Sequence, residues 1–133
     1  MRINYLSVVV AAVAAFVLSS VYYGALGQAV VRLHADQAAA AATLKPAPWK
    51  VIAELARTFI VAYVLALLAA RLGVADWKGA VQLAVMLWIA FSVVMWAGAI
   101  MWENVPVKLA AIHAGDWLVK TVLVTVIVGL WRR

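Results

Sequence analysis

Charge and cysteine are what this sequence has least of. Only 12% of the 133 residues are charged and none is cysteine, whereas about 25% of a soluble domain is charged. Without cysteine there is no disulfide, no thiol nucleophile and no thiolate ligand for a metal. In place of charge the chain is 69% hydrophobic, against about 45–50% in soluble domains. So much apolar surface exceeds what a small soluble core can bury, and the sequence predicts an integral membrane protein.

Acidic residues are scarcer than basic ones, five against eleven, which gives a net charge of +6. In a membrane protein such an excess usually marks cytoplasmic loops that face anionic lipid. Neither a basic run nor interleaved basic and aromatic residues point to nucleic acid, so we expect no nucleic-acid partner. The expected partner is the lipid bilayer, and no cofactor is indicated.

Four long apolar stretches are each long enough for the roughly 20 residues that a membrane-crossing helix needs. We expect helices over residues 4–27, 49–72, 78–102 and 105–131, and a loop over 28–48 that holds a short surface helix. A cleaved signal peptide is the rival interpretation of the first stretch, but its charge-free run is too long for a typical one. The short connections predict an all-α, four-helix antiparallel membrane bundle that forms a single domain over residues 1–133.

The basic residues and the aromatic belts also predict an orientation. The helix ends that carry more basic residues are expected to face the cytoplasm. This arrangement predicts a bacterial inner-membrane protein with both termini in the cytoplasm. The basic residues on that side are Arg2, Arg71, Lys78, Arg132 and Arg133.

The fourth stretch carries a polar stripe in an otherwise apolar helix, which Asn104 is expected to cap. At 100° per residue, His113, Asp116 and Lys120 fall within an arc of roughly 60°. Asp116 and Lys120 stand at i, i+4, the spacing of a helical ion pair. The stripe is either a structural lock or, with Glu103, a buried polar path or binding pocket. As metal ligands, the histidine and aspartate lack an identified third partner.

For three further patterns we prefer a structural interpretation to a functional one. Glu54 and Arg57, at i, i+3 near the start of the second stretch, are expected to form an interfacial ion pair. His34 and Asp36 in the loop are expected to be solvated rather than metal ligands. A tryptophan stripe on the third stretch is expected to serve packing rather than a cofactor.

No nucleophile elbow or phosphate loop is present, so we assign no catalytic and no metal residues, although a lipid-modifying enzyme stays open.

Stripes of small residues allow helices to approach closely. They exceed what one small bundle needs, so we expect a homo-oligomer, a dimer or trimer; ordinary alanine-rich composition facing lipid is the alternative. The expected helix-packing positions are Ala11, Ala15 and Ser19 on the first stretch and Gly115 and Gly129 on the fourth.

Two functions follow from these features. The first is a structural or interaction bundle that self-associates. The second is a small transporter or channel that uses the polar stripe, but the first helix offers few polar residues for a route. The first is therefore preferred, and any ion or small-molecule substrate is unknown.

Several short motifs resemble a family of small four-helix membrane proteins of bacteria, the domain of unknown function numbered seventeen sixty-one. The resemblance runs from Asn4 to Trp131 and implies the fold and the membrane but no activity. Members tend to show asparagine where His113 stands and tyrosine where Asp116 stands, so this charge is a departure. The motifs are Tyr22-Tyr23-Gly24, Arg32-Leu33, Ala62-Tyr63-Val64-Leu65, Gly79-Ala80, Trp88-Ile89-Ala90-Phe91 with alanine for the usual glycine, Pro106-Val107-Lys108-Leu109 and Ile112-His113-Ala114-Gly115.

Overall fold

The computed structural model describes residues 3–33 and 48–131. All regular structure in these two ranges is helical. They contain four spans that are long and apolar enough to cross a membrane, namely Tyr5–Leu26, Pro48–Arg71, Trp77–Glu103 and Val107–Leu130. The expected fold class, an all-α bundle with four transmembrane helices, is confirmed, and the chain is a multi-pass membrane protein.

Helix α1 spans Tyr5–Leu33 and thus continues past residue 27, where we expected it to end. Asn4 fixes its start, because the side-chain oxygen accepts the backbone N–H of Leu6 at 3.1 Å and of Ser7 at 3.3 Å. These N–H groups have no carbonyl partner in the first turn of a helix. The alanine-rich run expected to form the surface helix, together with His34 and Asp36, lies outside the described residues.

A tight turn joins the second and third spans. Helix α3 spans Pro48–Arg71, and Gly73 follows with a φ of 67°, a conformation that favours glycine. Helix α4, Trp77–Leu87, begins at once, because the Asp76 carboxylate accepts the backbone N–H of Gly79 at 3.0 Å. The short turn makes α3 and α4 consecutive antiparallel crossings.

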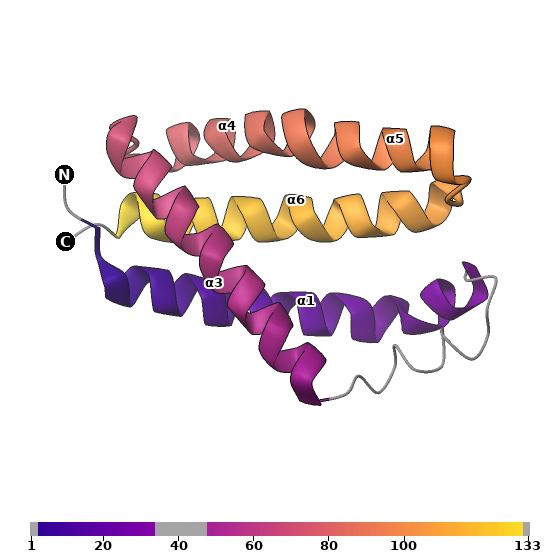
Figure 1. Cartoon of the computed structure of the whole chain (residues 1–133). Coiled ribbons are helices and arrows are strands. Elements are labelled where there is room, and N and C mark those ends of the chain that lie inside the picture. Colours follow the sequence, from indigo (N-terminus) through magenta and orange to yellow (C-terminus); the bar gives the residue numbers. More distant parts are fainter. Residues whose placement is uncertain (1–2, 34–47, 132–133) are drawn as a thin grey trace.

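The third span is one long rod in Figure 1. Helix α4 passes into a π-helical turn, η1 (Trp88–Val93), and then into α5 (Val94–Glu103). Asn104 ends α5 in the left-handed conformation, with φ of 56°. Our expectation that this asparagine caps the fourth helix was therefore wrong, because it closes the preceding one, a position asparagine tolerates well. Helix α6 spans Val107–Leu130.

Helix α6 is the centre of the fold and contacts each of the other spans. In Figure 1, α1 lies along one side of α6 and α4–α5 along the other, while α3 crosses α1 and α6 diagonally. The start of α1 and the end of α6 lie at the same end of the molecule.

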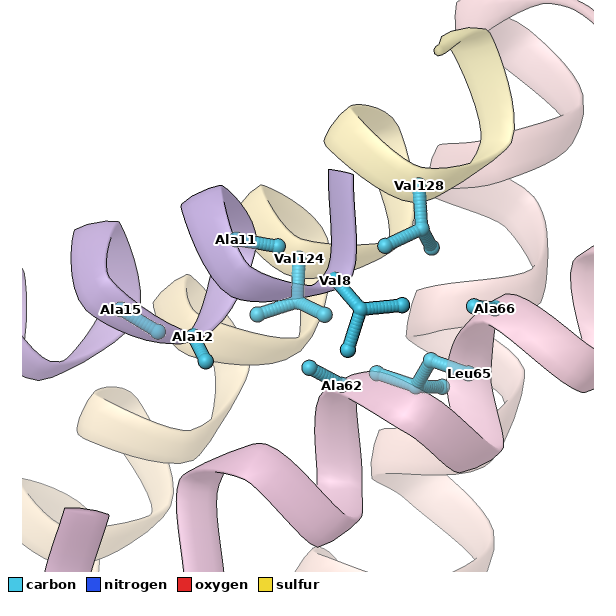
Figure 2. Packing of buried hydrophobic residues seen from close by; sticks show 9 residues of the cluster. All are labelled: Val8, Ala11, Ala12, Ala15, Ala62, Leu65, Ala66, Val124 and Val128. Carbon is cyan, nitrogen blue, oxygen red and sulfur yellow. The ribbon is translucent and has the colours of Figure 1, made fainter. Parts of the chain in front are cut away.

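The core is built mainly from small side chains, which let α1, α3 and α6 approach closely. Since lipid is as apolar as the core, tight packing rather than the hydrophobic effect holds such helices together. Figure 2 shows the buried cluster, formed by Val8, Ala11, Ala12, Ala15, Ala62, Leu65, Ala66, Val124 and Val128.

Candidate functional site: a polar network on helix α6

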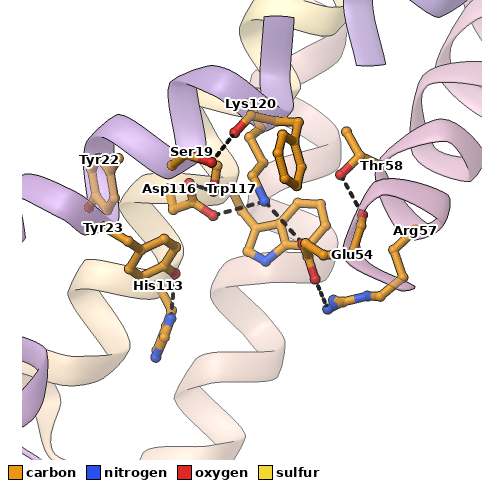
Figure 3. A network of polar contacts seen from close by, with 12 residues as sticks. Ser19, Tyr22, Tyr23, Glu54, Arg57, Thr58, His113, Asp116, Trp117 and Lys120 are labelled. Carbon is orange, nitrogen blue, oxygen red and sulfur yellow. Dashed lines mark hydrogen bonds and ion pairs between the residues drawn. The ribbon is translucent and has the colours of Figure 1, made fainter. Parts of the chain in front are cut away.

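Asp116 and Lys120 form a buried ion pair in the middle of the fold. Lys120 Nζ lies 3.1 Å from Asp116 Oδ2, and the two side chains are only 6% and 3% exposed. The other carboxylate oxygen, Oδ1, accepts a hydrogen bond from the hydroxyl of Ser19 on α1 at 2.8 Å. The aspartate therefore has a partner on each oxygen and ties α6 to α1 (Figure 3).

A second ion pair on α3 extends this network to the surface. Glu54 Oε2 lies 2.6 Å from Arg57 Nη1, and Oε1 of the same carboxylate lies 3.6 Å from Lys120 Nζ. Exposure rises along the chain of charges, to 36% for the Glu54 side chain and 61% for that of Arg57. The four groups carry two positive and two negative charges, so the network is neutral as a whole.

The Glu54–Arg57 pair lies deep along the bundle. It is linked to Lys120, which stands near the middle of α6, and Lys120 reaches back to Asp116 one turn earlier. Because α3 crosses diagonally, its first two turns lie beside the middle of the other helices rather than at their ends (Figure 1). The expected ion pair is therefore present and is joined to the buried charges, while its expected position at the membrane interface stays a prediction.

Trp117 lies between the two cations of the network. Lys120 Nζ is 4.5 Å from the centroid of the indole and the Arg57 guanidinium carbon is 5.9 Å from it. A cation over the face of tryptophan is attracted by the negative face of the ring, more strongly where water is excluded. The indole therefore gives both basic side chains a cation–π contact, which lipid tails do not provide.

His113 lies in an aromatic group next to the ion pairs. Its Nδ1 lies 2.6 Å from the hydroxyl of Tyr23, and its ring stacks on Trp96 with centroids 4.9 Å apart. The adjacent Tyr22 donates its hydroxyl to the carbonyl of Ile112 at 2.7 Å. Tyrosines of α1 and a tryptophan of α5 therefore hold the histidine-bearing turn of α6 from both sides.

The tryptophan stripe of the third span packs on α6, as its periodicity predicted. Trp88 Nε1 donates to the carbonyl of Ala114 at 2.8 Å. Trp96 stacks on the histidine, and its indole nitrogen is the one buried side-chain polar atom without a hydrogen-bond partner among the described residues. Glu103, which we grouped with the stripe, is exposed at the end of α5 and makes no ion pair within the part of the chain described.

The expected helix-packing positions make their contacts inside the chain. Ala11 and Ala15 are fully buried. A Cβ on Gly115 would come within 2.6 Å of the Tyr22 hydroxyl, and one on Gly129 within 3.3 Å of a Val74 methyl. These small residues let α1 and the start of α4 approach α6 closely.

Sequence reasoning found the stripe on α6 but not its partners on other helices. Ser19 was interpreted as a packing residue and the tyrosine pair as part of a family motif, because a periodic pattern does not say which neighbouring helix a side chain meets. The adjacency of Tyr22 and Tyr23, with the serine one turn earlier, was the available signal. No three side chains of histidine, aspartate or glutamate gather into a metal-binding group within residues 3–33 and 48–131.

Comparisons with known proteins agree with the resemblance noted in the motifs. Searches of the curated proteins and of the solved structures found no match. A family model described as "Protein of unknown function (DUF1761)" matches residues 6–129. Because the match covers nearly the whole chain, the protein belongs to this family of unknown function.

Proposed function

We propose that this protein is an interaction bundle that self-associates in the bacterial inner membrane, with both termini in the cytoplasm. The observation that carries the proposal is the Arg57 side chain, which is 61% exposed although it is joined to charges at the middle of α6. A charge at this depth costs about 2.5–3.5 kcal/mol on insertion scales, and such groups normally face protein or water. Covering this side chain with protein removes that cost.

The neutrality of the network supports an interaction role over catalysis. Asp116, Lys120 and Glu54 each have ionic partners already, and this mutual pairing is what a buried structural network requires. The exposed end at Arg57 is where such a network can be completed by another chain.

Native mass spectrometry in mild detergent, and in nanodiscs, tests self-association directly. We expect dimers or trimers at high protein-to-detergent ratio. A protein that stays monomeric in both media would refute the proposal.

Transport is the second candidate, and one observation favours it. Polar side chains from α1, α3, α5 and α6 converge in this region, whereas the sequence pattern pointed to few polar residues on the first helix. Proteoliposomes that contain wild-type protein or the Asp116→Asn variant, loaded with a pH-sensitive or cation-sensitive dye, give the test. A proton or monovalent-cation flux that falls at least tenfold in the variant would favour transport; the absence of flux would dismiss it.

A further inference from the structure

The exposed flank of α3 has a charge pattern that is complementary to itself. Glu54 and Arg57 stand side by side on it, one negative and one positive. The guanidinium has five N–H donors, and within the described residues only Nη1 takes part in an ion pair, to Glu54. A second copy of the same flank, turned by a two-fold axis, presents a glutamate to each arginine.

The reach of the two side chains makes this pairing possible in a membrane. For a dimer whose two-fold axis runs along the membrane normal, a residue and its equivalent in the second copy lie at the same depth. On an upright helix, residues 54 and 57 would differ in depth by about 4.5 Å, three rises of roughly 1.5 Å. The side chains of Arg57 and Glu54 already bridge this offset within one chain, at 2.6 Å, so they can also bridge it between two copies.

The charge balance also favours a second copy over an anionic lipid headgroup. The four charges of the network already sum to zero, and a phosphate on Arg57 would leave a net negative charge beside the bilayer core. A second copy adds an equally neutral network, in which each Arg57 and each Glu54 gains a further ionic partner. A net charge that is buried without an opposite charge beside it would destabilise the complex.

We infer that two copies of this chain pair through the α3 flank, with Arg57 of each copy against Glu54 of the other. This inference rests on the proposed self-association and names its surface. The interface also removes the exposed arginine from lipid in both copies at once.

Two charge-altering variants with different tags test the pairing. Arg57→Glu makes the flank doubly negative, and Glu54→Arg makes it doubly positive. We expect each variant alone to self-associate at least tenfold more weakly than wild type in detergent or nanodiscs, and the two together to form mixed dimers. Because an arginine beside Lys120 can impair folding, Glu54→Gln and Arg57→Gln form a second pair, and circular dichroism checks each variant for helix content.

Glu103→Gln is the matched control, since Glu103 is exposed at the end of α5, and it should associate like wild type. If wild type associates and all α3 variants do so equally well, this interface is wrong while the proposed function stands. If wild type itself is monomeric, the proposed function fails as well. Loss of association that mixing fails to restore overturns the pairing, as does restoration by anionic lipid alone or capture of a different protein on the flank.

Discussion

Asp116 and Lys120 should be strongly coupled in stability, and a double-mutant cycle measures that coupling. The variants are Asp116→Asn, Lys120→Met and the two combined. Asparagine keeps an oxygen for the hydrogen bond from Ser19 and removes only the charge. Methionine keeps most of the length of lysine, so neither change opens a large cavity.

The surroundings predict unequal losses. Lys120→Met leaves an almost fully buried carboxylate with the serine alone, and breaking a buried pair in this way costs about 3 kcal/mol. Asp116→Asn should cost less, about 1.5 kcal/mol, because the ammonium keeps a carboxylate oxygen of Glu54 at 3.6 Å and the face of Trp117. The double variant buries no unpaired charge at this position and should lose only about 2 kcal/mol, a coupling of about 2.5 kcal/mol.

Unfolding in mild detergent, followed by circular dichroism, gives the free energy of unfolding of all four proteins. Ser19→Ala is the control, because it removes a hydrogen bond to the aspartate while both charges stay. Losses that add to within about 0.5 kcal/mol would mean that the two residues act independently, and the network as described would be refuted.

Other positions give sharp predictions of their own. Gly115→Ala should destabilise the fold by about 1–3 kcal/mol, because the new methyl displaces a hydrogen-bonded tyrosine hydroxyl of α1. Gly24→Ala is the control and should leave the stability unchanged, because its new methyl would meet nothing within 4 Å. Equal unfolding midpoints for the two variants would contradict this packing. Trp88→Phe should cost about 1 kcal/mol in the same assay, because it removes a donor to an α6 carbonyl, and an unchanged stability would show that the bond contributes nothing. In the cysteine-free chain, single cysteines at Ala75 and Val105 should react with an impermeant reagent from opposite sides, the first from the cytoplasm; labelling from one side would end the four-crossing arrangement.

The helices were predictable from sequence because the bilayer imposes one simple requirement. A span needs about 20 apolar residues with its backbone bonded internally, and long charge-free runs meet that need. Helix ends were less predictable. Asn104 is a good residue for either end of a helix, and only the backbone conformation decides which one it closes.

The polar site was predictable only within one helix. The spacing of Asp116 and Lys120 placed them together because both lie on the same turns of α6. The partners on α1 and α3 depend on how helices cross, which periodicity does not encode. The contact between Glu54 and Lys120 was missed for the same reason, because the diagonal crossing of α3 brings the two side chains together.

Disulfide cross-linking in native membranes tests the central claim, self-association through the α3 flank, most directly. Ala53 is exposed one turn before Arg57 on the same side of α3, whereas Ile52 is exposed on the opposite flank of the helix. With no other cysteine in the chain, Ala53→Cys should form a dimer on mild oxidation and Ile52→Cys should remain monomeric. Cross-linking of Ile52→Cys alone, or of neither variant, would contradict the account.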